Sequence, residues 1–124
     1  MFPLYLAVTF TTAAMNVFAA IGDFARSKQV STAMARAGVP DAWLTTLGIL
    51  KTAGALGLLA GIGVPLIGTA AAVGLILYFV AAIIIHVRAR DYTLGPAAAF
   101  LLLAIAALVL ELHVRGAVAL VAAR

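Results

Sequence analysis

Apolar residues in this chain fall into long runs, which short polar segments separate. The first run covers residues 2–24 and contains few polar side chains, which are Thr9, Thr11, Thr12, Asn16 and Asp23. At about 1.5 Å per residue, a helix of this length crosses a hydrocarbon layer of about 30 Å. The first run therefore predicts a transmembrane helix.

Three further apolar runs cover residues 43–61, 65–87 and 96–113. The run that begins at Pro65 can start as a helix there, because the first turn of a helix leaves its N–H groups without intrahelical partners. The sequence GIGVP, residues 61–65, provides only a turn. Together the four runs predict an all-α membrane protein, in which four transmembrane helices form an antiparallel bundle and residues 1–124 form a single domain.

Two polar segments, 25–42 and 88–95, leave the membrane in this prediction. The first has the composition of a short helix that lies on the membrane surface and ends before Gly38 and Pro40. Both segments carry basic residues, which are Arg26, Lys28, Arg36, Arg88 and Arg90. Because basic loops tend to stay in the cytoplasm, both segments are predicted to be cytoplasmic and both termini external.

The composition agrees with a bilayer environment. Hydrophobic residues make up 66% of the 124 positions and charged residues only 10%, far from the mixture found in soluble domains. The net charge of +4 comes from basic residues at the ends of apolar runs, where they meet lipid headgroups and not nucleic acid. The absence of cysteine excludes disulfides, thiol catalysis and thiolate metal sites.

Small residues recur every four positions on the second and third predicted helices. Gly57 and Gly61 form a G-x-x-x-G pattern, and Ala70 and Gly74 repeat the spacing. Such faces allow two helix backbones to approach closely. The pattern favours packing within one chain, and a homo-oligomer is the alternative.

The stretch LGILKTAGALGLLAGIGVPLIGTAAAVGLILYFVAAIIIHVRARDY resembles the DoxX-like family of small bacterial membrane proteins. In that family a helix with one ionisable residue leads into GALGLL, a turn, a second apolar helix and a His-x-Arg-x-x-Asp/Glu segment. Here these features correspond to Lys51, residues 54–59, and His86, Arg88 and Asp91. The resemblance extends to about Leu110 and implies a four-helix protein of the bacterial plasma membrane.

The resemblance also implies a ligand and a partner protein. The wider family is named for a subunit of a thiosulfate:quinone oxidoreductase, and some relatives accompany redox enzymes or assist the assembly of other membrane proteins. A quinone-like ligand and a membrane oxidoreductase partner are therefore expected from the resemblance.

Lys51 is the most informative charged residue. Counted from Trp43, it lies about 12 Å into the bilayer, and a lone lysine at a helix centre costs about 2.5–3.5 kcal/mol on insertion scales. Either its side chain reaches back to the surface, or an internal partner offsets the cost. Asn16 and Asp23 share one face of the first helix by their spacing, and Lys51 is predicted to approach one of them, for example in an ion pair with Asp23 that has Asn16 above it.

The segment AAIIIHVRARDY, residues 81–92, ends the third predicted helix with a group of charges. His86, which can change protonation near neutral pH, and Asp91 are predicted to close the mouth of a polar pocket above Lys51. Arg88 and Arg90 are predicted to anchor the helix end among lipid phosphates, as Trp43 does at the start of the second helix.

The remaining polar residues lie near the end of the last predicted helix. Glu111, His113 and Arg115 are predicted to form a polar fringe at the external interface. Because His113 and His86 are predicted at opposite faces of the membrane, they make a poor ligand pair for a metal or a haem. No protein-bound metal is therefore expected.

Two classes of function fit these residues. In the first, the chain is a binding or accessory subunit that holds a quinone-like molecule near Asn16, Lys51 and His86, or that stabilises a larger membrane enzyme. In the second, the chain is a small membrane enzyme or proton-coupled carrier in which Asp23, Lys51 and His86 handle protons. The absence of an inverted repeat and of a nucleophile motif favours the first class.

Overall fold

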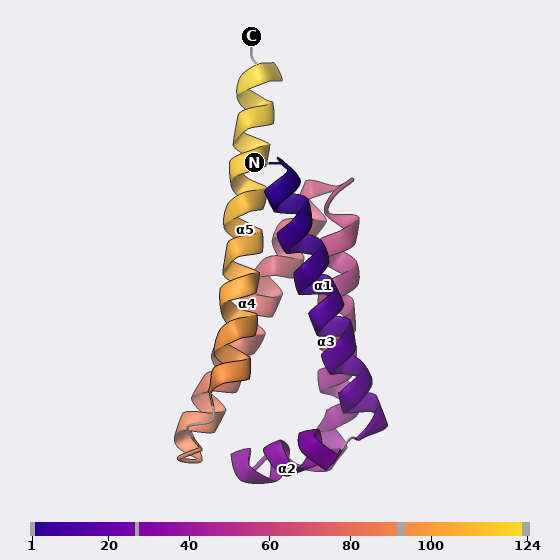
Figure 1. Cartoon of the computed structure of the whole chain (residues 1–124), viewed down its shortest axis with the longest axis vertical. Helices are drawn as coiled ribbons and strands as arrows, with labels where there is room; N and C mark the ends of the chain where they lie inside the picture. Colours follow the sequence, from indigo (N-terminus) through magenta and orange to yellow (C-terminus); the bar gives the residue numbers. More distant parts are fainter. Residues whose placement is uncertain (1, 27, 92–93, 123–124) are drawn as a thin grey trace.

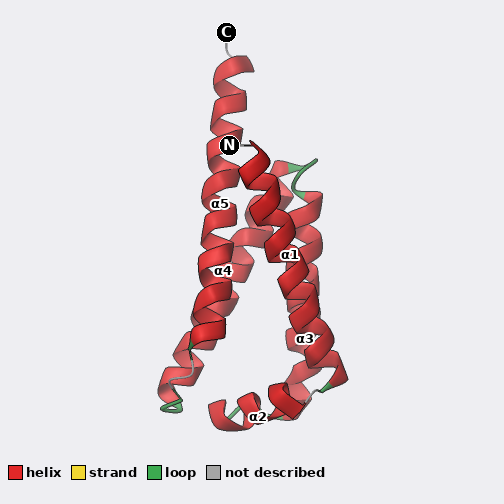
Figure 2. Ribbon diagram, in the orientation of Figure 1, coloured by secondary structure: helices red, strands yellow, loops and turns green. Residues whose placement is uncertain are grey.

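The computed structural model describes residues 2–26, 28–91 and 94–122, and no strand occurs in these ranges. The helices are α1 (Phe2–Ala25), α2 (Lys28–Ala37), the 3₁₀ helix η1 (Asp41–Trp43), α3 (Leu44–Ala60), α4 (Pro65–Arg88) and α5 (Gly95–Ala122). Short loops join them, as Figure 2 shows. The prediction of an all-helical protein is confirmed over the described residues.

Among the described residues, three segments are long and apolar enough to cross a membrane. They are α1, α4 and the part of α5 from Gly95 to Gly116. α3 is apolar but has only 17 residues, which at about 1.5 Å per residue is shorter than a hydrocarbon layer of about 30 Å. The chain is therefore a multi-pass membrane protein, whereas a crossing by α3 depends on the turns that flank it.

The long helices pack around a common axis. α1 contacts α3 and α5, and α4 contacts the same two helices. Figure 1 shows that consecutive long helices run in opposite directions, and that the α1/α3 pair and the α4/α5 pair diverge toward the end where α2 lies. α2 crosses this wider end and contacts α4.

Glycines hold α3 and α4 together at the opposite end. A methyl group added at Gly61 would lie 2.3 Å from the Cα atom of Gly68, and one added at Gly57 would lie 2.6 Å from the Cβ atom of Ala71. The G-x-x-x-G pattern thus packs against α4 of the same chain. Gly74, by contrast, has no atom within 4 Å of such a methyl group.

A small apolar core lies between α3, α4 and α5. It contains the buried side chains of Leu58, Ala72, Leu75, Phe79 and Ala104. The rings of Phe79 and Phe100 stack with centroids 5.1 Å apart. Many other large apolar side chains face outward, among them Phe18 at 80% and Leu66 at 74% exposure. Such a surface is suited to lipid and not to water.

The helix boundaries differ from the predicted ones in two places. The second apolar run starts as η1 before it becomes α3, so Trp43 lies in the 3₁₀ turn. The last helix does not end near His113 but continues to Ala122, and in Figure 1 it extends beyond the other helices. The expected surface helix after the first run is present as α2.

Candidate functional site

A buried ion pair joins α1 to α3. The Nζ atom of Lys51 donates a hydrogen bond to Oδ2 of Asp23 at 2.9 Å, and the two side chains are 14% and 3% exposed. A lysine inside an apolar helix needs such a partner, because an unpaired charge there is costly. Of the two alternatives for Lys51, the structure shows the internal partner and not extension to the surface.

Tyr78 of α4 contacts Lys51 of this ion pair, so a third helix contributes to the cluster. Its ring lies below the ammonium group of Lys51, with 5.8 Å from Nζ to the ring centroid. This is within the range in which a cation is attracted to an aromatic face. Tyr78 was not predicted from the sequence as a site residue, although a tyrosine inside an apolar helix needs a partner for its polar end.

Asn16 lies on the buried face of α1 and bonds within that helix. Its Nδ2 atom donates to the carbonyl oxygen of Thr12 at 2.8 Å. Thr12 in turn donates from Oγ1 to the carbonyl oxygen of Val8 at 2.7 Å. Thus Asn16 shares a face with Asp23, as its spacing indicates, but it forms its hydrogen bond on α1 itself.

His86 and Asp91 form a second pair at the end of α4. The Nδ1 atom of His86 lies 3.0 Å from Oδ2 of Asp91, and both side chains are largely buried. The backbone sets this distance. Arg90 has a φ of 56°, Arg90 N donates to Val87 O, and Asp91 N donates to His86 O at 2.8 Å. These bonds form a Schellman turn that folds Asp91 back over His86.

The predicted anchors are at the ends of helices. Arg88 is the last residue of α4, Arg90 lies in the turn that follows, and both residues are exposed. Trp43 is 56% exposed at the start of α3. Their role as membrane anchors stays a prediction.

An apolar cavity of about 770 Å³ lies between α3 and α4 and extends to α2. Small residues supply much of its wall, including Ala53, Gly54 and Gly57 on α3 and Ala70 and Gly74 on α4. Trp43 and Met34 lie at the end near α2. Because several wall residues are exposed, the cavity opens toward the surrounding lipid.

The cavity includes only part of the predicted polar pocket. His86 and Tyr78 line it, whereas Asn16, Asp23, Lys51 and Asp91 are not among its lining residues. Tyr78 links the two regions, since it lines the cavity and also contacts Lys51. The structure therefore separates an apolar cavity with a histidine at one end from an ion pair behind Tyr78.

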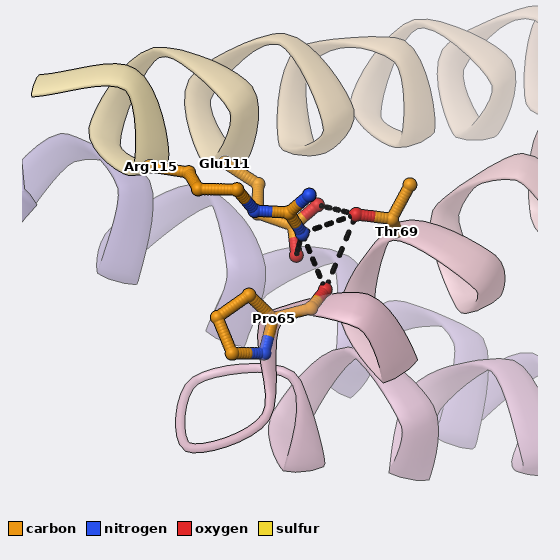
Figure 3. Close-up of polar contacts among 4 residues, drawn as sticks. All are labelled: Pro65, Thr69, Glu111 and Arg115. Carbon is orange, nitrogen blue, oxygen red and sulfur yellow. Dashed lines mark hydrogen bonds and ion pairs between the residues drawn. The ribbon is translucent and has the colours of Figure 1, made fainter. Parts of the chain in front are cut away.

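A third polar cluster joins α4 to α5 near the turn at 61–64, as Figure 3 shows. Oγ1 of Thr69 donates to Oε2 of Glu111 at 2.8 Å, and Nη2 of Arg115 lies 3.3 Å from Oε1 of the same carboxylate. The same Arg115 atom donates to the Pro65 carbonyl oxygen at 2.7 Å and also contacts Thr69. The cluster thus ties the first turn of α4 to α5.

The prediction of an external polar fringe is wrong for Glu111. Glu111 is only 6% exposed, and a methyl group added at Gly68 would lie 2.5 Å from its Oε1 atom. The absence of a side chain at Gly68 lets the carboxylate enter between the helices. His113, two positions along, is exposed as a fringe residue would be. The spacing of four residues between Glu111 and Arg115 was the sequence signal that could have indicated their ion pair.

The described residues contain no group of three or more His, Cys, Asp or Glu side chains that could hold a metal ion. His86 and Asp91 are the nearest arrangement to such a group in the candidate site, and two ligands are fewer than structural or catalytic metal sites use. The pair places the His86 ring beside the Asp91 carboxylate at the end of α4.

Comparison with known proteins gives one result. A family model described as the DoxX-like family matches residues 7–109, from the first turns of α1 to the middle of α5. The match includes both the Lys51–Asp23 and the His86–Asp91 pairs. No curated protein and no solved structure matches the chain.

Proposed function

The chain belongs to the DoxX-like family of membrane proteins, and from this premise we propose that it binds a lipophilic, quinone-like molecule in the cavity between α3 and α4. The observation that carries the proposal is the cavity itself. Its volume of about 770 Å³ is in the range of about 300–1,000 Å³ that is typical of small-molecule sites. In this role the protein is a binding or accessory subunit of a membrane redox system.

The shape of the cavity suits an isoprenoid or alkyl tail. Alanine positions on both helices and the open position at Gly74 keep side chains small along the groove, and its open side faces lipid, from which such a tail would enter. Polar groups occur at few positions of the wall, among them His86 and Tyr78. A molecule with a long apolar tail and a small polar head matches that distribution.

His86 is suited to hold the polar head. Its Nδ1 atom faces the Asp91 carboxylate, which can only accept, so Nδ1 carries the proton and Nε2 is left for a ligand. A protonated ring would donate from Nε2 to a quinone carbonyl, and a neutral ring would accept from a hydroquinone hydroxyl. Asp91 is thus a positioning residue for His86.

In this proposal the chain crosses the plasma membrane of a bacterium four times as an antiparallel bundle. η1 adds a turn before α3, which brings that helix closer to the length of a crossing. Lys28, Arg36 and Arg88 lie at the end of the molecule that contains α2, which supports a cytoplasmic location for that end. Both termini are then external.

Quenching of Trp43 fluorescence tests the proposal. Trp43 is the single tryptophan of the chain and it lines the cavity, so a quinone bound there should quench its emission. We expect saturable quenching when decylubiquinone is added to the purified protein in lipid nanodiscs. The purified protein should also retain a quinone or similar lipid that mass spectrometry detects.

Two glycine variants make the test specific. Gly74→Leu should abolish saturable quenching, because it fills the groove at a position where an added methyl group meets no atom within 4 Å. Gly116→Leu is the matched control, since Gly116 has equally open surroundings and lies outside the cavity. Equal quenching in both variants would place the quinone elsewhere. Absence of quenching and of any retained ligand in the parent protein would favour a scaffolding role.

An oxidoreductase partner and a homo-oligomer stay predictions from the sequence. The exposed apolar surface of the long helices is accounted for by contact with the lipid bilayer. If either association exists, the oxidoreductase or a second copy of the chain should co-purify with the protein from native membranes without detergent.

A further inference from the structure

A line of buried polar side chains runs along the inner face of α1. Tyr5, Thr9, Thr12, Asn16 and Asp23 are all buried there, at spacings of three, four or seven residues. From Tyr5 to Asp23 this face is about 27 Å long, at about 1.5 Å per residue. It therefore extends along most of the helix, inside the protein and apart from the cavity between α3 and α4.

Two atoms on this face lack the hydrogen bonds that buried polar groups normally make. Asn16 is fully buried, and its Oδ1 atom has no partner among the described residues. Thr9 is 1% exposed and lies near the Tyr5 hydroxyl, but its Oγ1 atom forms no hydrogen bond of normal geometry. An unsatisfied group of this kind costs about 1–3 kcal/mol, so a partner is expected.

Rotation of the Asn16 amide does not remove the problem. Its Nδ2 atom donates to the Thr12 carbonyl oxygen, and an exchange of nitrogen and oxygen would place two acceptors together. The Oδ1 atom therefore faces the interior as an acceptor. Ala13 and Ala20, the buried neighbours of Asn16 on the same face, have small side chains without polar atoms. A water molecule is the natural partner, because it can donate to Oδ1 and accept from another group.

Each end of the line meets an ionisable cluster. At one end Asp23 is paired with Lys51. At the other end Tyr5 is buried on α1, which packs against α5, the helix that carries Glu111 and Arg115. Arg115 has a side chain that is 33% exposed, and Lys51 one that is 14% exposed, so neither cluster is sealed completely. The polar face of α1 thus runs from the Asp23–Lys51 pair along the helix that packs against α5, which carries Glu111.

We propose that the inner face of α1 holds a file of bound water molecules, through which protons move between Glu111 and the Asp23–Lys51 pair. Water donates to Asn16 Oδ1 and Thr9 Oγ1, and the Thr12 hydroxyl, which donates to Val8, accepts from the same file. Carboxylates joined by hydroxyl, amide and water groups are the usual components of proton relays in membranes. The inference does not depend on a ligand in the cavity.

Transfer of magnetisation from water in solid-state NMR tests the hydration of this face. In the full chain in lipid bilayers, we expect rapid transfer from water to Thr9, Thr12 and Asn16, comparable with that to Thr32 on α2. Thr11 is the internal control, because it is adjacent to Thr12 but exposed on the outer face of α1. If Thr12 proves as dry as Thr11 while Thr32 is hydrated, the file is absent and the proposal is wrong.

Proton flux into vesicles tests the relay. In vesicles loaded with a pH-sensitive dye and driven by a potassium diffusion potential, the parent protein should carry protons. Asn16→Leu and Thr12→Val should reduce the flux to that of protein-free vesicles, whereas Thr11→Val should leave it unchanged. Thr12→Val keeps the size of the side chain, so it decides the outcome if Asn16→Leu fails to fold. A parent protein with no more flux than empty vesicles would overturn the proton role.

Discussion

The two ends of the α3/α4 pair are built differently. Near the turn at 61–64, Gly61 approaches Gly68 so closely that no side chain fits between them. Toward α2 the helices leave a cavity, and Gly74 has open space where a side chain would be. Similar small residues thus serve opposite purposes. At one end they allow contact between backbones, and at the other Gly74 leaves open space beside the cavity.

The charged residues differ in the same way between the two ends. Glu111 at the closed end interacts with two groups, Thr69 and Arg115, and ties α4 to α5. At the open end Lys51 pairs with Asp23 and His86 pairs with Asp91. The closed end therefore has the features of a structural junction, whereas the open end combines two polar pairs with the apolar cavity where we propose ligand binding.

The largest effect is expected at the buried pair. Lys51→Asp would place two carboxylates together and should cost more than the roughly 3–5 kcal/mol typical of breaking a buried pair. Lys51→Leu should cost less, because leucine suits the apolar surroundings and places no second carboxylate beside Asp23. Unfolding in mixed detergent micelles measures both free energies. Lys28→Asp on the exposed helix α2 is the control, and equal losses for the two Lys51 variants would contradict the pairing.

The next largest effect on stability is expected for glycine substitutions at the two ends of the α3/α4 pair. Gly61→Ala should lower the free energy of unfolding by about 1–3 kcal/mol, because its methyl group would overlap the backbone at Gly68. Gly74→Ala should leave stability unchanged or raise it by up to about 1 kcal/mol, since alanine favours the helix over glycine. Thermal unfolding of the two variants side by side is the measurement. Similar losses would mean that both ends are closely packed.

A smaller effect is expected for Glu111→Gln. The amide oxygen can still accept from Thr69, so the main loss is the ion pair with the partly exposed Arg115, worth about 1 kcal/mol or less. His113→Gln is the control, because His113 is exposed two positions away. A loss of several kcal/mol, measured by the same unfolding assay, would show that the carboxylate charge itself holds α4 and α5 together.

The smallest effect concerns the turn after α4. Arg90 has a φ of 56°, a conformation that glycine adopts without strain. Arg90→Gly should therefore change stability by less than about 1 kcal/mol, with relief of strain partly offset by greater freedom of the unfolded chain. Decylubiquinone quenching should persist in this variant. Loss of quenching with unchanged stability would give Arg90 a role in binding beyond an anchor.

Hydrophobic pattern predicted the helices well because each run is set by local sequence. The runs at 2–24 and 65–87 became α1 and α4 almost as predicted, and the spacing of Asp23 correctly placed it on the inner face. The pair with Lys51 also followed from a general rule, the high cost of an isolated charge in lipid. The hydrophobic periodicity of the sequence and the free-energy cost of an isolated charge in lipid were sufficient to predict these features.

Other features depended on how the helices approach one another, which sequence spacing does not determine. Glu111 looked like an interfacial residue, and only the absence of a side chain at Gly68 on another helix makes room for it inside. For the same reason, the contact between Tyr78 and Lys51 could not be foreseen from either helix alone. The cavity likewise arises from the divergence of α3 and α4.

The unequal lengths of the helices affect the lipid around the protein. α3 has 17 residues, whereas α1 and α4 have 24 each. An apolar segment shorter than the hydrocarbon layer draws the headgroups inward and thins the bilayer beside it, at a cost of fractions of a kcal/mol per Å. Longer acyl chains raise that cost on the side of the molecule where the cavity opens. In the proposed arrangement, in which α3 crosses the membrane, the chain length of the surrounding lipids thus acts on the entrance to the cavity.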